Sequence, residues 1–444
     1  MNHKSITLIV FALIAMLTLG ACQSEPDAEP DITESIDLIG DNPPVKVLTQ
    51  RPVNEVVGEK DVLLPALSPD GSAIAWVKST GKRQKTRVTE VCIYTFADAR
   101  NACSQKPDAY SSYPAQLVWS PDSAHIAFSE NPLQLGDESD IWMFSVADGS
   151  FVNLTDDGLE GFWRDPEAGS YFLDYLPMWN QEDGLIYFWR SLPVSFQEVT
   201  LQLMRISPEG GEPELVADVS DELMGQLIWW DYEFFYMDGP WAVSPDGSRA
   251  ALLVGAMDTL SGSPLNGLWT IDLADPSGGP QQVLTTDQMQ VALPPWQEVP
   301  ARPIALSWSA DSSQVVVLAQ SQDLKNQINL FYVVEVPDGT AIPVYDFSGV
   351  TTREGMFATS QPMELPPLYY SAWTAGLSPA GDKLLMYTDF AAASGILSAS
   401  LADAGDLPAV VYASDDTTSY VVTRTSRSSD GKVILNGSLY TVEE

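Results

Sequence analysis

The 444-residue sequence is poor in basic residues, histidine and cysteine. Lys and Arg together number 22 against 60 Asp and Glu, so the formal net charge at pH 7 is −38. Proteins that neutralise nucleic-acid phosphates need a basic surface, and this deficit therefore argues against a nucleic-acid partner. With two His and three Cys, the chain also lacks the clustered ligands that a zinc site requires. We expect no metal centre of that kind.

The sequence lacks the short motifs of several enzyme classes. It has no Gly-x-Ser-x-Gly elbow, no phosphate-binding Gly-x-x-x-x-Gly-Lys-Ser/Thr loop and no Gly-x-Gly-x-x-Gly motif. His3 lies in the N-terminal segment described below, which leaves His125 as the one candidate base for a Ser-His-Asp triad. Paired carboxylates stay open as catalytic groups, because 60 acidic residues guarantee close pairs, but nothing marks a particular pair. We therefore favour a noncatalytic protein without a cofactor.

The one long hydrophobic run lies at the N-terminus. Met1–Lys4 is positively charged, and Ser5–Leu19 is a mostly apolar run of 15 residues, shorter than the roughly 20 residues of a membrane-spanning helix. The run ends in Leu19-Gly20-Ala21-Cys22, which resembles the lipobox of bacterial lipoproteins. We predict a signal peptide over residues 1–21 and lipidation of Cys22. The alternative is an ordinary signal peptide followed by an incidental cysteine.

Residues 22–44 have the composition of a tether. They carry seven acidic residues, four Pro and no basic residue, so the segment repels itself and stays solvated. A lipidated cysteine carries the two or more acyl chains that stable anchoring needs. We expect an extracytoplasmic protein, anchored by lipid to the bacterial cell membrane or the outer membrane.

Cys92 and Cys103 are the two other cysteines. They flank a strand-like segment, a turn at Ala97–Asn101 and a return segment, so they lie opposite each other across a predicted hairpin. An exported chain meets an oxidising environment, which favours a disulfide between them. The alternative is a pair of buried free thiols.

An internal repeat predicts the fold. Seven segments share a polar turn, typically Ser-Pro-Asp-Gly, followed by an apolar strand, and successive turns are 50 to 69 residues apart. Each unit then continues with a third and a fourth strand around a second turn. The seven segments are Leu67–Val77, Trp119–Phe128, Trp179–Phe188, Val243–Leu252, Trp308–Val317, Leu377–Met386 and Arg427–Leu435.

Four antiparallel strands repeated around a ring form a β-propeller. We predict an all-β fold in which residues 45–444 form one propeller of seven four-stranded blades; six or eight blades are the alternatives if the third or last unit is misread. The last unit lacks one strand, and Val45–Leu48 is placed to supply it and close the ring. Such closure removes exposed sheet edges.

These repeats resemble those of TolB-type propellers, which also occur in the prolyl-oligopeptidase class. The resemblance covers residues 45 to 444 and is weaker in the third and sixth units, where Pro or Asp is displaced. It implies the propeller fold. No α/β-hydrolase domain follows the repeats in this sequence, so the peptidase activity of that class is not implied.

The connections on one face of the predicted ring are rich in aromatic residues. In a propeller, the links between blades and those between second and third strands emerge on the face opposite the Ser-Pro-Asp-Gly turns. Tyr and Trp bury a large area at low entropy cost, so this rim suits a protein or a sugar, although the same residues could pack between blades. The candidate binding residues are Trp163, Arg164, Tyr171, Tyr175, Trp230, Tyr232, Tyr236, Trp296, Tyr369, Tyr370 and Trp373.

Two further charged features have simpler interpretations. Structural Ca²⁺ is conceivable at Asp156-Asp157-Gly158 or Asp415-Asp416, but no Asp-x-Asp-x-Asp-Gly ladder is present and Asp-rich turns are common. The basic run Lys82–Arg87 suits an anionic partner or lipid headgroups, and a solvated loop is the simpler alternative.

Two hypotheses of function follow. In the first, the protein is a monomeric, lipid-anchored scaffold whose aromatic and acidic rim binds another envelope or extracellular protein without catalysis. In the second, the rim aromatics stack on an oligosaccharide and a carboxylate pair supplies acid–base chemistry, which would make the protein carbohydrate-binding or carbohydrate-active.

Overall fold

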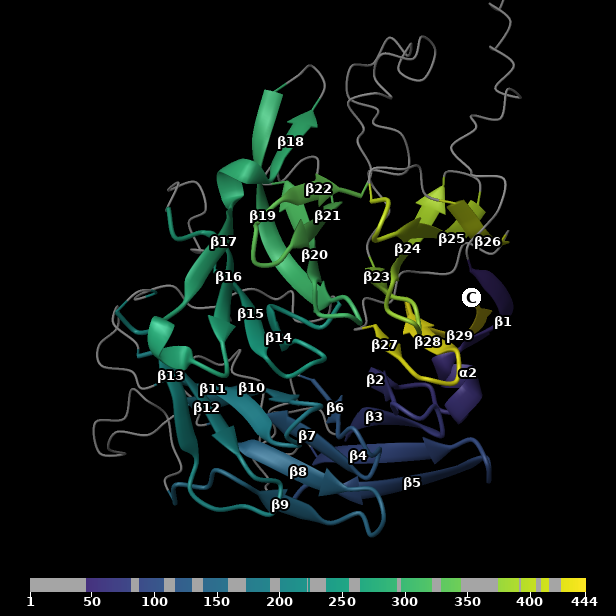
Figure 1. Cartoon of the computed structure of the whole chain (residues 1–444). Helices are drawn as coiled ribbons and strands as arrows, with labels where there is room; N and C mark the ends of the chain where they lie inside the picture. Colours follow the sequence, from purple (N-terminus) through teal and green to yellow (C-terminus); the bar gives the residue numbers. More distant parts are fainter. Residues whose placement is uncertain are drawn as a thin grey trace, which may run out of the picture. The chain divides into compact units, whose positions relative to one another are not determined.

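Seven antiparallel sheets follow one another in chain order around a ring (Figure 1). This is a β-propeller of seven four-stranded blades, as the seven repeats predict. The computed structural model describes residues 45–444 apart from 81–87, 108–115, 130–138, 159–172, 192–199, 222, 224–236, 255–263, 294–296, 322–328, 345–373, 391–392, 405–408 and 415–424.

The strands of the first four blades follow one another in chain order from the inner to the outer edge of the blade. Blade 1 contains β2 (Leu63–Leu67), β3 (Ala73–Thr80), β4 (Val88–Thr95) and β5 (Arg100–Gln105), and blade 2 contains β6 (Val118–Trp119), β7 (His125–Ser129), β8 (Ile141–Ser145) and β9 (Phe151–Asn153). Blade 3 contains β10 (Leu173–Trp179), β11 (Ile186–Ser191), β12 (Gln202–Ile206) and β13 (Glu214–Asp218), and blade 4 contains β14 (Trp241–Val243), β15 (Arg249–Val254), β16 (Gly267–Asp272) and β17 (Gln281–Thr285).

The other three blades keep the same inner-to-outer order, with small departures in blades 5 and 7. Blade 5 has β19 (Gln297–Trp308), β20 (Gln314–Ser321), β21 (Asn329–Glu335) and β22 (Ala341–Pro343), with a fifth strand, β18 (Gln290–Leu293), paired to the first residues of β19. Blade 6 has β23 (Thr374–Leu377), β24 (Lys383–Phe390), β25 (Ala393–Ser400) and β26 (Ala409–Ser414). Blade 7 has β27 (Ser426–Arg427), β28 (Lys432–Leu435), β29 (Ser438–Glu443) and β1 (Lys46–Pro52).

The Ser-Pro-Asp turn joins the first and second strands of a blade by side-chain hydrogen bonds. In blade 1 the Ser68 hydroxyl donates to Asp70 Oδ1 at 2.7 Å and accepts the Ala73 N–H at 2.9 Å, while Asp70 Oδ1 also accepts the Ser72 N–H at 2.9 Å. The same Ser-to-Asp bond, 2.6 to 2.7 Å long, occurs at Ser120–Asp122, Ser244–Asp246, Ser309–Asp311 and Ser428–Asp430. The turn therefore satisfies polar groups that the strands leave unpaired.

The core consists of seven apolar clusters, one at each seam between neighbouring blades. The seam of blades 3 and 4, for example, packs Trp189 against Trp241 with ring centroids 5.6 Å apart, and both side chains are buried. Fully burying one large apolar side chain contributes about 1.5–3 kcal/mol. The stability of the ring is therefore distributed over seven similar interfaces.

Tryptophan side chains also link neighbouring inner strands by hydrogen bonds. Trp308, directly before the turn of blade 5, donates its indole N–H to the Ala242 carbonyl oxygen of blade 4 at 3.1 Å. The equivalent residues of blades 2 and 3 do the same, with Trp119 donating to Ala66 O at 3.1 Å and Trp179 to Val118 O at 3.0 Å. Aromatic residues of the repeat thus act at the seams.

The ring closes within blade 7. Strand β1 pairs antiparallel with β29, from Lys46 opposite Glu443 to Pro52 opposite Ser438, which confirms the closing strand expected from the sequence. Figure 1 shows β1, in purple, beside β29, in yellow. The short helix α2 (Val53–Val57) follows, and its three valines are buried in the cluster between blades 7 and 1.

A disulfide joins Cys92 on β4 to Cys103 on β5, the pair that the sequence places across a hairpin. The two cysteines are direct partners in the strand register, with their Cα atoms 4.0 Å apart. The bond therefore ties the outer strand of blade 1 to Cys92, a residue of the apolar cluster between blades 7 and 1.

Candidate binding face

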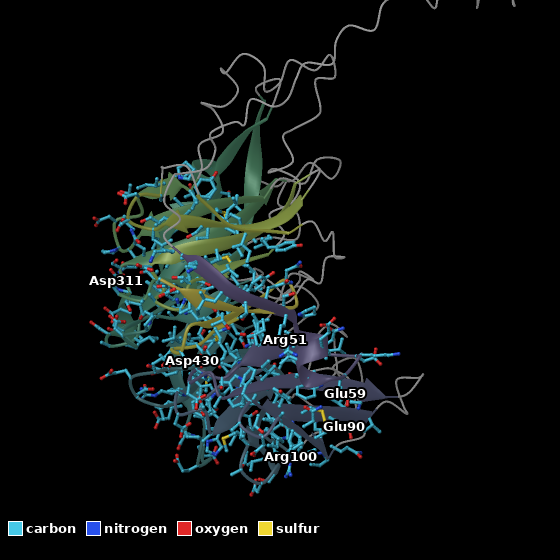
Figure 2. The ribbon with its side chains drawn as sticks, turned by 90° about the vertical axis from the view of Figure 1, so that its right-hand side faces the viewer. Arg51, Glu59, Glu90, Arg100, Asp311 and Asp430 are labelled. Carbon is cyan, nitrogen blue, oxygen red and sulfur yellow. A yellow bond between two sulfur atoms is a disulfide. The ribbon has the colours of Figure 1, made fainter. Side chains whose placement is uncertain are left out.

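The strand order defines two faces of the ring. Each inner strand ends at a Ser-Pro-Asp-type turn, so these turns share one face with the turns between third and fourth strands; we name it the turn face. The opposite loop face carries the links between second and third strands and between blades. Figure 2 shows Asp311 and Asp430 of the turn face on the opposite side from Glu59 and Glu90.

Most of the predicted rim lies in parts of the chain that the structure does not describe. Trp163, Arg164, Tyr171, Trp230, Tyr232, Tyr236, Trp296, Tyr369, Tyr370, Trp373 and the predicted lipidation site Cys22 all lie outside the described residues.

Tyr175 is the predicted rim residue that the structure describes, and it is a core residue. Its side chain lies on β10 in the cluster between blades 3 and 4, with 1% of the residue exposed. Its hydroxyl shares a 2.9 Å hydrogen bond with the Ser191 hydroxyl. The expectation that Tyr175 contacts a partner is therefore corrected: at this position the aromatic ring packs between blades.

A buried ion pair stands at the loop-face ends of β10 and β11. Arg190 donates through Nε to Asp174 Oδ1 at 2.7 Å and through Nη2 to Asp174 Oδ2 at 2.6 Å. The two residues are direct partners in the register of the two strands. This two-point geometry is the strongest that Arg and a carboxylate form, and it fixes the direction of the guanidinium.

Residues of blade 2 surround this pair. The Ser139 hydroxyl donates to the Asp174 carbonyl oxygen at 2.8 Å, and the Asp174 N–H donates to the Ser139 carbonyl oxygen at 2.7 Å. Next to Ser139, Asp140 accepts hydrogen bonds from Asn153 Nδ2 at 2.7 Å and from the Thr155 hydroxyl at 3.4 Å. We call Asp140, Asp157, Asp174 and Arg190 the Arg190 cluster.

The electrostatics of the Arg190 cluster follow from burial and an excess of negative charge. Burial raises the pKa of Asp174, whose side chain is 2% exposed, and Arg190 opposes that rise. Burial by itself would lower the pKa of Arg190, but the hydrogen bonds and charge of Asp174, together with Asp157 and Asp140, raise it. The guanidinium stays charged, and three carboxylates around one cation leave a local charge of −2 when all are ionised.

The Arg190 cluster could hold a cationic or hydrogen-bonding group of a ligand, but it offers no nucleophile and base in contact. His125 lies at the other end of a blade, where its backbone N–H donates to the Ser120 hydroxyl at 2.8 Å. Asp156, of the calcium candidate at 156–158, accepts the Gly158 N–H at 2.8 Å, as an Asp-containing turn does. In the described ranges no group of three or more His, Cys, Asp or Glu is arranged to hold a metal ion.

Sequence reasoning missed the Arg190 cluster although a signal was present. A hairpin centred on the turn between β10 and β11 brings Asp174 close to Arg190, and the register shift between Tyr175 and Met178 makes the two residues direct partners. A charged residue on each of two otherwise apolar strands marks such a pair. The partners from blade 2 need the contact between blades, which no spacing within the sequence reveals.

None of the helices in the described part of the chain has the length and hydrophobicity that a membrane span requires.

No protein-family model matches the sequence, and no curated protein matches it significantly. Among solved structures, a puromycin hydrolase aligns with 88% of this chain and 52% of its own, at 14% identity and a TM-score of 0.48. Prolyl oligopeptidase B from Galerina marginata, bound to a 35mer substrate, aligns over 81% of this chain and 42% of its own, at 11% identity and a TM-score of 0.44. A protein from Agrobacterium tumefaciens provisionally assigned as TolB aligns over 80% and 97%, at 13% identity and a TM-score of 0.38.

The chain thus spans about half the length of the hydrolase and the peptidase that it resembles. At these identities the similarity concerns the fold alone. The chain is a seven-bladed propeller with structural neighbours among TolB-like and prolyl-oligopeptidase propellers.

Proposed function

We propose that the protein is an extracytoplasmic, lipid-anchored scaffold that binds another envelope or extracellular protein through its loop face, without catalysis. The observation that carries this proposal is the contrast between the two faces. On the turn face, Asp70, Asp122, Asp246 and Asp311 are all hydrogen-bonded by their own turns, so these carboxylates serve the fold.

In the sequence, the connections assigned to the loop face differ in length and composition from blade to blade. The described part of this face contains the Arg190 cluster, which carries more charge than local structure needs and adjoins the segment that contributes Trp163, Arg164 and Tyr171 in the sequence. Trp, Tyr and Arg are the residue types enriched in protein-binding hot spots.

Photo-crosslinking in the native host tests the proposal. A photoreactive residue replaces Trp230 or Tyr370, two residues of the rim predicted from the sequence, and Ala97, an exposed residue of the turn face, serves as the matched control position. We expect both predicted rim positions, but not position 97, to give the same discrete protein adduct. Glycan adducts would favour the carbohydrate hypothesis, and identical adduct patterns from all three positions would contradict a specific docking face.

The anchor is tested separately. Replacing Cys22 with Ala should move the protein from the membrane fraction to the soluble extracytoplasmic fraction, and mass spectrometry of the natural N-terminus should show acyl chains on Cys22. Unchanged membrane association of Cys22→Ala would refute lipid anchoring and leave the docking experiment unaffected.

A further inference from the structure

Arg427 occupies a seam position where three of the other six blades place tryptophan. It directly precedes Ser428 of the blade 7 turn, as Trp308 directly precedes Ser309 in blade 5. Instead of an indole, a guanidinium reaches toward blade 6, where Nη1 donates to the Ser378 carbonyl oxygen at 3.1 Å. The guanidinium lies so close to Gly381 that any Cβ at that residue would clash with it.

Few acceptors and no directly paired carboxylate of the described residues stabilise the charge of this guanidinium. Among the described residues, the Ser378 carbonyl oxygen is its one hydrogen-bond acceptor, although an arginine has five N–H donors. Burial lowers the pKa of Arg427, and the more distant carboxylates of Asp238 and Glu444 oppose that change. A partly buried cation without a paired carboxylate is unfavourable, so this position favours an anion as its neighbour.

The adjacent turn of blade 6 has its carboxylate two residues later than the other turns. Asp382 accepts a hydrogen bond from the Ser378 hydroxyl at 3.3 Å and pairs with Lys383 Nζ at 2.9 Å. Ala380 stands where five other turns have Asp, so the inner ring of turn carboxylates is interrupted beside Arg427. A carboxylate from elsewhere in the chain is present there. The Ala380 N–H donates to Glu444 Oε1 at 3.3 Å, and Lys383 Nζ lies 3.8 Å from Glu444 Oε2. The Glu444 side chain is 17% exposed, so most of it lies against the protein surface beside this turn.

We propose that the blade 6 turn is a carboxylate-binding site, formed by the Ala380 N–H, Lys383 and Arg427, whose present occupant is the side chain of Glu444. An acidic peptide segment of a partner protein is the ligand class that fits, because its carboxylate can replace Glu444 and reach the unused guanidinium donors. Glu444 then acts as an internal competitor. The site lies on the turn face and is independent of the proposed docking on the loop face.

Substitution of the internal competitor tests the proposal with a defined probe, fluorescein-labelled tetraglutamate, measured by fluorescence anisotropy at low ionic strength. The test variant is Glu444→Gln. The control is Glu443→Gln, which removes the same charge from the exposed residue beside it. Labelled tetraglutamine reports binding that does not depend on carboxylates.

We expect Glu444→Gln to bind tetraglutamate at least tenfold more tightly than both the unmodified protein and Glu443→Gln, with no change for tetraglutamine. Adding Arg427→Gln to Glu444→Gln should abolish the gain. If that double variant does not fold, Lys383→Gln in the Glu444→Gln background should remove at least threefold of the gain. Equal affinities of the two single variants, or a gain that survives both second substitutions, would overturn the proposal.

Discussion

Replacing Arg190 with Met should destabilise the propeller by about 3–5 kcal/mol, because it leaves the Asp174 carboxylate buried without its charge partner. The structure supports the upper part of this range, since both carboxylate oxygens are bound, at 2.7 and 2.6 Å. The two side chains are only 13% and 2% exposed, so water cannot replace the lost hydrogen bonds. Met keeps most of the aliphatic packing.

Urea unfolding at 25 °C, followed by tryptophan fluorescence, measures the effect as a change in midpoint at constant slope. Arg205→Met is the matched control: Arg205 pairs with Glu214 within the same blade, but these side chains are 39% and 66% exposed. Exposed pairs contribute only about 0.2–1 kcal/mol. Removing both charges, in Asp174→Asn with Arg190→Met, should recover most of the loss because no buried charge remains.

The pH dependence gives a second reading of the same effect. Burial raises the pKa of Asp174, and without Arg190 only the hydrogen bond from Thr155 opposes that rise. A carboxyl whose folded pKa exceeds its unfolded pKa favours the folded state at low pH, and this advantage disappears as pH rises through the folded pKa. Arg190→Met should therefore lose more stability at pH 7 than at pH 5. Equal, small losses for Arg190→Met and Arg205→Met, independent of pH, would refute the buried-pair argument.

Three shorter predictions concern the blades. Trp308→Phe should cost about 1–2 kcal/mol more than Trp189→Phe, because both indoles are buried but only the first donates a hydrogen bond to a described residue; chemical denaturation of both variants measures the difference. Gly267→Ala should prevent soluble expression, since its Cβ would meet a backbone oxygen, whereas Gly158→Ala meets no atom within 4 Å and should fold with a loss of roughly 1 kcal/mol. Hydrogen bonds from Ser309 and Ser313 lower the pKa of Asp311. The stability that Asp311 contributes is therefore present above about pH 4 and is lost as pH falls through its folded pKa. In unfolding measurements at pH 7 and pH 3, the stability of Asp311→Asn should be closer to that of the unmodified protein at pH 3.

The repeat made the fold predictable, because each turn combines local chemistry with a recognisable spacing. Ser68 and Asp70 are two residues apart and satisfy each other, so their role can be inferred from the sequence. The closing strand was predictable because the last repeat has three strands of its own and needs a fourth from the start of the propeller. The Arg190 cluster and the Glu444 contact join residues of different blades, and such contacts depend on how two sheets pack.

Tyr175 shows why aromatic residues near a rim are ambiguous. The propeller needs large apolar groups at seven seams, and the same residue types serve partner binding. Tyr175 lies on a strand, two residues from a position where Pro177 and a register shift bend the inner edge of blade 3. Its ring faces the neighbouring blade, and sequence distance from the turn cannot separate this position from one on the exposed rim.

The turn motif also explains why a net charge of −38 does not by itself create a binding site. A carboxylate that accepts hydrogen bonds from a serine hydroxyl and a backbone N–H is committed to its turn, and its lowered pKa, as at Asp122 and Asp311, expresses that commitment. Binding sites are better sought where charged groups are not matched by the hydrogen bonds of their own turn. Two such places are the Arg190 cluster, where carboxylates outnumber the cation they surround, and the blade 6 turn, where Arg427 lies beside Ala380 instead of the usual Asp. They lie on opposite faces, so a partner that uses one leaves the other open to a second ligand.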